Sequence, residues 1–552
     1  MINLYIFNFV LYISLFIFLY FLGRSFLITN SLIIHKKKNL NEKIFEMKSN
    51  IFYPVIGIFY LGNILILLNF FVPINNIYVF VFIFLLLIPN FLEFKLNSPK
   101  INIEFLTKYI LIPSILIISL YSTGWHYDAG FYHLNHQNWL RESNMILGFV
   151  NIHWAFGMSS IYEYVSAFFW LENSFILLHF LNLIFFHFLY LVLIDNLNNS
   201  SNNILRNSSL FILLFSLLDN FGINGGRNGF LYVQGVTKQD IAVGVIFFIL
   251  CRSIIVQIYK NKINEDDLFI VVLLSLLIIQ IKLSSISIVF LLIYYLYFIF
   301  KNTDIRFSRS ILNNIFSIIF GVLWITKQYL TTGCFIYPVN FTCRNDFDWY
   351  SKNSTESYEA ITVNSSYSLP LYDYNVVEWF RTFLSFRINA TVLTNFIVSV
   401  ILLYIFKKFI LKNSKIDKTI KNISLALIVL NLIYLIYYGP TPRYLIGLML
   451  FIVSYLGYND VELKIKFTHI QIYSLVLISA VFLIRSTSYS ELINGGSDKL
   501  FDPRDEAKYI QQSNGWVKPD SGDQCWINLE CTMSTHELEI VRRQLFNVAI
   551  RD

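Results

Sequence analysis

The sequence predicts an all-α polytopic membrane protein with about fourteen transmembrane helices. Of its 552 residues, 56% are hydrophobic and only 14% are charged, whereas about a quarter of the residues in a soluble domain are charged. The apolar residues are also clustered, because runs such as 4–22, 77–92 and 175–194 carry almost no charge over the length that crosses a bilayer. Continuous runs of this kind favour helices over the alternating segments of a β-barrel.

Charge in the loops predicts the orientation of these helices. The predicted spans lie near residues 3–22, 51–71, 76–93, 107–122, 174–194, 208–219, 241–258, 266–282, 284–300, 311–327, 393–410, 421–438, 443–458 and 468–485. Lysine and arginine gather in alternate short loops, as expected for loops on the cytoplasmic side. Both termini and three longer segments (123–173, 328–392 and 486–552) are therefore expected outside. The net charge of +7 belongs mainly to the short loops and does not indicate a nucleic-acid partner.

These expectations divide the chain into four parts. Residues 1–122 form about four transmembrane helices, which include a retained first helix rather than a cleaved signal. Residues 123–173 form an exoplasmic segment with two helices at the membrane surface, 174–485 form a core of about ten helices with the external loop 328–392, and 486–552 form an exoplasmic tail. Four of the five cysteines fall in the external parts, which favours the disulfides Cys334–Cys343 and Cys525–Cys531 over unpaired thiols.

The segment 124–153 carries the densest polar chemistry, including four of the nine histidines. Asp128 is the candidate for catalysis, since an external carboxylate beside aromatic rings can accept a proton from a hydroxyl or bind a divalent cation. The alternative is that Asp128 caps the helix expected from Ala129. His133, Gln137, Arg141 and Asn144 recur at spacings of 4, 4 and 3 and are expected on one face of that helix.

A divalent metal ion is a possible cofactor at this segment. Its candidate ligands are Asp128, His126 and His133, although their spacing matches no strict zinc signature. The alternative is that these histidines form hydrogen bonds to neighbouring groups or phosphates. Glu163, between two tyrosines in the next apolar stretch, is expected to reach water rather than to serve as a second acid.

Cations near the outer ends of spans are candidates for binding a phosphate. Arg443 follows a tight turn and offers the forked guanidinium that suits phosphate, although an interfacial anchor is equally compatible with its position. Lys282 lies at the end of an apolar run, and the segment 237–240 offers a further cation–carboxylate pair or a helix cap. The remaining candidates for substrate binding are His136, His153, Arg141 and Trp349. The Trp349 ring is suited to stacking on a sugar and equally to anchoring at the membrane interface.

Three short stretches resemble a bacterial family of large membrane proteins of envelope-polysaccharide synthesis. The stretch Tyr127–His133 is similar to its D-x-G-[LF]-Y-H signature, Gly148–His153 to its G-L-x-N-[LI]-H segment, and Phe156–Ser160 to its G-F-N-S-S-like segment. The wider architecture is similar to the GT-C class of glycosyltransferases. The external loop follows about the fourth span here and the first span in that class, and Asp128 has no acidic neighbour two residues away.

The resemblance implies a glycosyltransferase on the outer face of a bacterial inner membrane. Its donor would be a sugar linked to a polyprenyl phosphate, and its acceptor a cell-envelope glycan or glycolipid. Asp128 would be the general base, His133 would position the acceptor or assist a metal, and Arg443 with Lys282 would hold the donor phosphate. The alternatives are a polymerase of preassembled glycan units, a glycolipid transporter or flippase without chemistry, and an assembly subunit.

Overall fold

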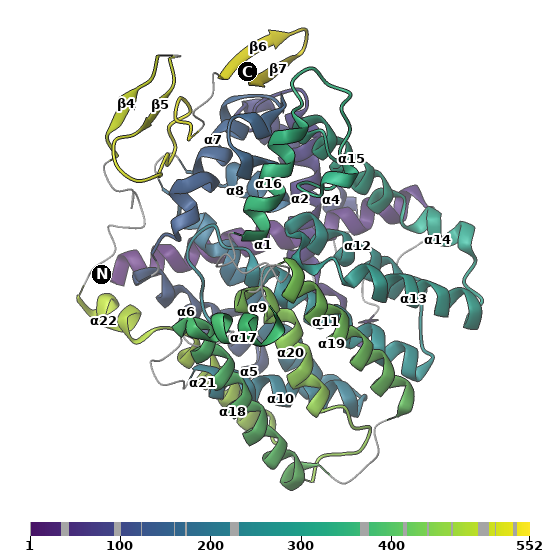
Figure 1. Cartoon of the computed structure of the whole chain (residues 1–552). Coiled ribbons are helices and arrows are strands. Elements are labelled where there is room, and N and C mark those ends of the chain that lie inside the picture. Colours follow the sequence, from purple (N-terminus) through teal and green to yellow (C-terminus); the bar gives the residue numbers. More distant parts are fainter. Residues whose placement is uncertain are drawn as a thin grey trace.

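The protein is described by a computed structural model that covers residues 2–34, 43–92, 101–122, 124–158, 160–171, 174–220, 231–364, 375–411, 417–438, 441–464, 467–494, 507–513, 515–533 and 538–551. Helices make up most of it, and the strands are short and few (Figure 1). The predicted cytoplasmic lysines at 36–38, 95, 100, 412, 415 and 466 lie outside the described residues, as do the first two residues of the turn 439–443.

The N-terminal helices form one tightly packed group. Gly23 and Gly57 let α1 and α2 cross closely, since a Cβ on Gly23 would lie 1.9 Å from the carbonyl oxygen of Tyr53. Such close helix crossings depend on small residues. The elements are α1 (Ile2–Ile33), β1 (Lys43–Ile44), β2 (Met47–Lys48), η1 (Ser49–Ile51), α2 (Tyr53–Asn69), α3 (Ile77–Leu85), α4 (Pro89–Leu92), α5 (Ile103–Leu106), η2 (Thr107–Leu111), α6 (Ile112–Leu116) and η3 (Ile117–Tyr121).

The middle of the chain supplies the interior of the helical assembly. The apolar parts of α9 and α11 are entirely buried among other helices. Both helices are hydrophobic all round, which is typical of a helix with no exposed face. The elements of this part are α9 (Ile176–Asn199), α10 (Asn203–Asn220), α11 (Asp240–Lys260), α12 (Glu265–Ile281), η7 (Leu283–Ser285), α13 (Ile288–Asn302), α14 (Phe307–Asn313) and α15 (Ile315–Thr332).

The C-terminal helices complete this assembly. α20 packs against α10 and α11, and α18 packs against α10. The elements are α17 (Val376–Ser385), α18 (Arg387–Ile410), α19 (Lys418–Tyr438), η10 (Pro442–Leu445), α20 (Ile446–Leu456), α21 (His469–Leu483) and α22 (Ser486–Asn494).

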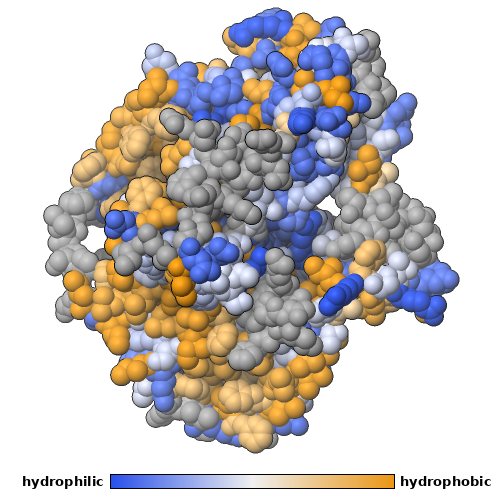
Figure 2. Space-filling view, turned by 90° about the vertical axis from the view of Figure 1, so that its left-hand side faces the viewer, coloured by the Kyte–Doolittle hydropathy of each residue, from blue (hydrophilic) through white to orange (hydrophobic). Residues whose placement is uncertain are grey.

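Helix length and composition support a membrane protein. Among the described residues, six helices are long and apolar enough to cross a bilayer, or seven if the bent pair α21–α22 forms one span. Large apolar side chains point outward from several helices, for example Phe84 on α3 (60% exposed) and Ile397 on α18 (56% exposed), as expected for a surface in contact with lipid. Figure 2 shows hydrophobic residues over much of the lower and left part of one face and hydrophilic residues at its top. Each of the fourteen predicted ranges contains helix, but fourteen crossings remain a prediction.

The three predicted external segments come together in space. Strand β7 of the tail pairs in parallel with β3 of the segment 123–173, and the Asn151 side chain donates to the backbone oxygens of Trp349 and Ala549. The tail strands lie at the top of Figure 1, beyond α7 and α16. The elements are η4 (Ala129–His133), α7 (Leu134–Glu142), β3 (Ile146–Leu147), η5 (Phe149–Asn151), η6 (Trp154–Met158), α8 (Ile161–Phe168), η8 (Asn340–Thr342), α16 (Lys352–Asn364), β4 (Tyr509–Gln511), β5 (Val517–Pro519), β6 (Leu538–Arg543) and β7 (Phe546–Arg551).

Both predicted disulfides are confirmed. Cys334 is bonded to Cys343 and Cys525 to Cys531, whereas Cys251 is free and buried in α11. Each bridge lies within one of the segments that are predicted to be external. The bridges close loops of sequence separation 9 and 6, and each bridge packs within a small cluster of buried side chains.

Candidate functional site

Asp128 forms an ion pair with Lys238. Its carboxylate contacts the Lys238 ammonium directly, and the Nδ1 atom of His126 lies 3.5 Å from its other oxygen. The Asp128 side chain is 22% exposed, whereas that of Lys238 is only 7% exposed. Asp128 stands immediately before the π-helical segment η4, but its carboxylate accepts no capping hydrogen bond from the backbone N–H groups of that segment. The capping interpretation is therefore wrong, because the side chain turns toward Lys238 instead.

A close approach of two backbone segments brings Lys238 to Asp128. Trp125 and Val236 form a parallel bridge, and a Cβ on Gly235 would lie 3.0 Å from both the Gly124 carbonyl oxygen and the His126 nitrogen. Glycine suits this contact, because a Cβ would be tight against both backbone atoms. The next residue but one, Thr237, has φ +77°, a strained conformation for a β-branched residue of the kind that concentrates at functional sites.

A second ion cluster lies at the start of α11. The Asp240 carboxylate is 3% exposed, and it contacts the Lys282 ammonium at 2.5 Å and the Arg443 Nε at 3.8 Å. Both cations also lie over the Tyr444 ring, at 4.2 Å for Lys282 and 5.3 Å for Arg443. The two cations predicted to bind phosphate are thus brought together around one carboxylate.

Small residues hold the two helices of this cluster together. A Cβ on Gly244 of α11 would lie 2.5 Å from the Ile446 side chain, and a Cβ on Gly447 of α20 would lie 2.8 Å from that of Phe247. The helices approach this closely because neither glycine has a side chain. The contact fixes Asp240, at the start of α11, relative to Arg443, which lies just before α20.

A cavity of about 760 Å³ joins the two ion pairs. Its lining includes Lys238 with three arginines, and Asp240 is the one carboxylate among the lining residues. Asp128 is not among the lining residues, but it contacts His126 and Lys238, which both line the cavity. A crevice of only about 10 Å³ beside α11 and α20 shares Asp240 and Arg443 with this cavity and is lined by polar and apolar residues in similar measure. The arginines are Arg387, Arg443 and Arg485.

The charges of this site shift its pKa values. Burial alone would raise the pKa of Asp128, but the contact with His126 and the charge of Lys238 prevail and hold it well below its usual range. Burial lowers the pKa of Lys238 to about 8, aided by the charge of Arg443 and opposed by Asp128. Burial also lowers the pKa of His126, so its imidazole is neutral at pH 7. The site is therefore positively charged at neutral pH.

Glu163 is buried rather than exposed to water, contrary to the expectation from its sequence neighbours. It is 2% exposed, and its carboxylate accepts hydrogen bonds from His133 (2.5 Å), Gln137 (2.6 Å) and Gln239 (2.9 Å). His133 follows Asp128 by five residues, and Gln239 is the neighbour of Lys238. Glu163 therefore ties together the two segments that carry the Asp128–Lys238 pair.

Three of the four residues predicted on one helical face share it, whereas Asn144 lies beyond the end of α7 and donates to the Leu545 carbonyl oxygen at 2.9 Å. His133 and Gln137 point to Glu163 on α8, and Arg141 donates to the Ala167 carbonyl oxygen at 3.0 Å. The Arg141 guanidinium also lies 5.1 Å from the centre of the Trp170 ring. These contacts fasten α7 to α8, and none of these three residues lines the cavity.

Three other candidates for substrate binding lie away from the cavity. His136 is 1% exposed and stacks on Phe156, and His153 is 6% exposed. Burial lowers the pKa of both histidines, to about 3 for His153. Trp349 is 4% exposed and packs next to Gly148. The two histidines pack against aromatic side chains of their own segment, and Trp349 packs against the segment 123–173. None of the three lines the cavity, so nothing here supports their predicted contact with substrate.

The metal candidates do not meet at one point. His133 turns to Glu163, whereas His126 approaches Asp128. Within the part of the chain that the structure describes, no three His, Cys, Asp or Glu side chains group as metal ligands. The residues present here therefore do not fit a divalent cation, since such an ion needs several oxygen or nitrogen ligands.

Three basic residues of this region had no sequence motif to mark them. Arg387 opens α18, and Arg485 follows α21 at the cavity. Lys327, near the end of α15, is 1% exposed, and its ammonium lies 5.6 Å from the Tyr164 ring. Their shared signal is a cation at the end of an apolar run, which is costly in a membrane unless it faces a polar interior.

Comparisons with known proteins give one family. A family model described as "Domain of unknown function (DUF8201)" matches residues 4–450. This range includes both ion clusters of the site and ends before the tail. No curated protein and no solved structure matches the chain.

Proposed function

Given that the chain belongs to the DUF8201 family, we propose that it is a membrane glycosyltransferase similar to the GT-C class. It moves a sugar from a polyprenyl-phosphate-linked donor to a cell-envelope glycan or glycolipid. The observation that carries this proposal is the cationic cavity next to the Asp128–Lys238 ion pair. A donor whose sugar is linked to a phosphate carries the charge that matches this cavity.

The charges of the cavity support a phosphate ligand. Lys238, Arg387, Arg443 and Arg485 line the cavity against the single carboxylate of Asp240. Arginine and lysine stabilise phosphate through charge-assisted hydrogen bonds. A volume of about 760 Å³ is within the range of small-molecule sites.

Asp128 is the proposed general base. A carboxylate paired with Lys238 is a weak base, because the pair stabilises its ionised form. A donor phosphate that contacts Lys238 competes for that charge and raises the proton affinity of Asp128. Donor binding therefore precedes proton transfer, and His133 acts as a positioning residue through Glu163.

The proposed reaction is a displacement at the anomeric carbon of the donor sugar. The acceptor hydroxyl oxygen forms the new bond to this carbon, and its proton goes to Asp128. The bond from the carbon to the phosphate oxygen breaks, and the carrier phosphate leaves with the bonding electrons. The cations around the cavity stabilise the charge on that leaving group.

The proposed location is the outer face of a bacterial inner membrane. Support comes from the meeting of the three segments 123–173, 328–392 and 486–552, which the charge pattern places outside. Residues of the segments 123–173 and 328–392 line the cavity, His126 and Arg387 among them. A polymerase of preassembled glycan units is the second candidate, since it uses the same carrier and the same base.

The test is transfer by purified protein in detergent from a lipid-linked sugar donor. Asp128→Asn is expected to abolish transfer while leaving protein yield unchanged, since the amide cannot accept the proton. Asp348→Asn is the matched control, because that external carboxylate is 59% exposed and pairs with Arg543. Normal transfer by Asp128→Asn would remove the catalytic role. Movement of the donor between the leaflets of vesicles that contain the protein, without product, would indicate a flippase.

Arg443→Ala tests the phosphate contact. It is expected to raise the KM for the donor by about tenfold or more and to leave the KM for the acceptor nearly unchanged. Arg309→Ala is the control, because Arg309 lies on α14 and pairs with Glu265. An equal rise for donor and acceptor would assign Arg443 a structural role instead.

A further inference from the structure

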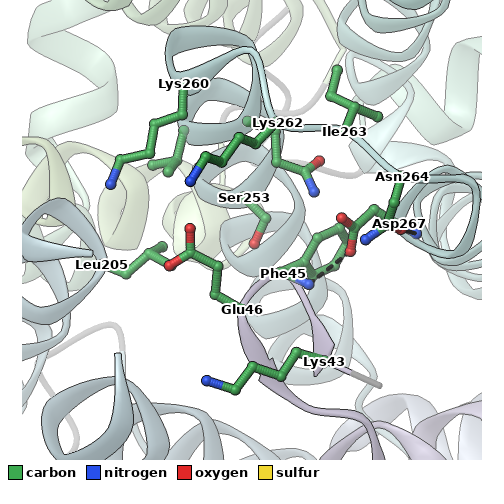
Figure 3. A pocket seen from close by; sticks show the side chains of 12 residues that line it. Lys43, Phe45, Glu46, Leu205, Ser253, Lys260, Lys262, Ile263, Asn264 and Asp267 are labelled. Atoms are coloured by element: carbon green, nitrogen blue, oxygen red, sulfur yellow. Dashed lines mark hydrogen bonds between the residues drawn. The ribbon is translucent and has the colours of Figure 1, made fainter. Parts of the chain in front are cut away.

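A second pocket lies at the other end of α11. Asp240 begins this helix and Lys260 ends it, so the two ends are roughly 30 Å apart at 1.5 Å per residue. The pocket has a volume of about 410 Å³ and lies between the β1–β2 hairpin, α10, α11 and the start of α12 (Figure 3). Its position separates it from the cavity beside Asp128.

Three lysines give this pocket its chemistry. Lys43 comes from β1, Lys260 from the last turn of α11, and Lys262 from the following loop. In the chain as described, none of the three forms an ion pair with a carboxylate. Figure 3 shows Lys260 and Lys262 side by side above the Glu46 carboxylate, with Lys43 on the opposite side. Three ammonium groups around one space form an anion site, because phosphate and carboxylate ligands balance their mutual repulsion.

The β1–β2 hairpin forms one wall of the pocket. Its two turn residues, Phe45 and Glu46, have φ of +50° and +64°, although such turns ordinarily use glycine, asparagine or aspartate. The Asp267 carboxylate accepts the backbone N–H of Phe45 at 2.7 Å, and Phe45 itself is 2% exposed. The tertiary contact with α12 thus holds a strained turn, which presents Glu46 to the pocket.

A buried polar group lines the same space. Ser253 of α11 is 1% exposed, and its hydroxyl has no hydrogen-bond partner within the described part of the chain. One oxygen of Glu46 is likewise without a partner there. Buried polar groups are ordinarily paired, so an orphan in a pocket indicates a place for a polar ligand.

We propose that this pocket binds a phosphate ester of a polyol. The lysines hold the phosphate, while Glu46 and Ser253 pair with hydroxyl groups of the polyol. Glu46 explains why the ligand is not a bare phosphate, because a carboxylate repels a phosphate and accepts from a hydroxyl. Soluble polyol phosphates and the headgroup of phosphatidylglycerol share this chemistry. The inference stands independently of the proposed glycosyl transfer.

The test is calorimetric titration of the purified full-length protein in detergent. The probes are glycerol 3-phosphate, inorganic phosphate and, for the lipid source, a short-chain phosphatidylglycerol. Saturable binding of glycerol 3-phosphate or of phosphatidylglycerol is expected, and the one that binds more tightly identifies the source. Lys260→Ala/Lys262→Ala is expected to weaken binding by about tenfold or more, and Ser253→Ala by a smaller factor.

Lys407→Ala/Lys408→Ala is the matched control, because it removes two lysines from the last turn of α18, outside the pocket. It is expected to leave affinity within about twofold. An equal loss in this control would show a general charge effect and overturn the site. The absence of saturable binding to any probe would also overturn it, and equal affinity for inorganic phosphate would overturn the polyol. If the alanine pair fails to fold, the exposed Lys262→Ala alone carries the same expectation.

Discussion

Replacement of Glu163 by glutamine tests whether this buried carboxylate holds the site together. Its Oε1 atom accepts from His133 and from Gln239, and its Oε2 atom accepts from Gln137. A glutamine keeps the shape but replaces one of these oxygens with an NH₂ group. With its oxygen facing His133, the new amide nitrogen faces the Gln137 nitrogen, which is also a donor.

Gln137 cannot turn over without a further loss. Its own oxygen accepts the indole N–H of Trp170 at 2.8 Å, so a flipped amide would leave that buried N–H unpaired. Hydrogen bonds to a charged group contribute about 1.5–3 kcal/mol each, and a buried donor without an acceptor costs about 1–3 kcal/mol. Because one contact is lost and the others lose their charge, we expect Glu163→Gln to lower the free energy of unfolding by about 2–4 kcal/mol.

The assay is denaturant-induced unfolding in mixed micelles, followed by tryptophan fluorescence. Glu356→Gln is the control, because Glu356 is 51% exposed and its contact with Lys352 is 3.7 Å long, and we expect a change below about 0.5 kcal/mol. Glycosyl transfer by Glu163→Gln should also fall, since Glu163 fixes the segments of Asp128 and Lys238. A Glu163→Gln protein as stable as the control would refute the reasoning.

Three further predictions concern the site and the tail. Burial lowers the pKa of Lys238 to about 8, so its ammonium loses its charge as the pH rises through 8. Equilibrium binding should therefore show a donor affinity that falls above pH 8 in the wild type and stays constant with pH in Lys238→Arg. A wild-type affinity that does not change with pH would contradict this assignment. Gly244→Leu should push α11 away from α20, because even a Cβ at position 244 would lie 2.5 Å from the Ile446 side chain. In the same micelle assay it should lower the free energy of unfolding by about 1–3 kcal/mol, and it should also weaken donor binding. Cys525→Ser/Cys531→Ser removes the disulfide between two cysteines that are 6 residues apart, which should destabilise the tail by about 2 kcal/mol. A protease should then cut the tail of the variant faster than the tail of the wild type. Equal cutting rates in the variant and the wild type would argue against a stabilising role of this disulfide.

Local sequence pattern was sufficient for much of the architecture. Apolar runs located helices because a long apolar helix satisfies its own backbone hydrogen bonds wherever it lies. The spacing of His133, Gln137 and Arg141 placed them on one face, as their contacts with α8 confirm. The cysteine pairs lie close in sequence, so their bridges needed no knowledge of the fold.

The sequence did not reveal the roles of residues whose partners lie far away along the chain. Glu163 was expected to reach water because its sequence neighbours are apolar and aromatic, yet its partners come from α7 and from the segment before α11. Trp349 was a candidate for stacking on a sugar or for anchoring at the membrane interface, yet its ring is buried next to Gly148. In both cases burial depends on which segments meet, and one segment's composition does not contain that information.

By itself, the sequence determined a helical membrane protein, its paired cysteines and the unusual polar segment near Asp128, because composition and short-range spacing are properties of the chain alone. Only the tertiary structure decided that Asp128 meets Lys238, 110 residues away, and that Asp240 gathers Lys282 and Arg443. The physical reason is that an ion pair depends on distances of a few ångströms, which the packing of helices and the close contact at Gly235 establish.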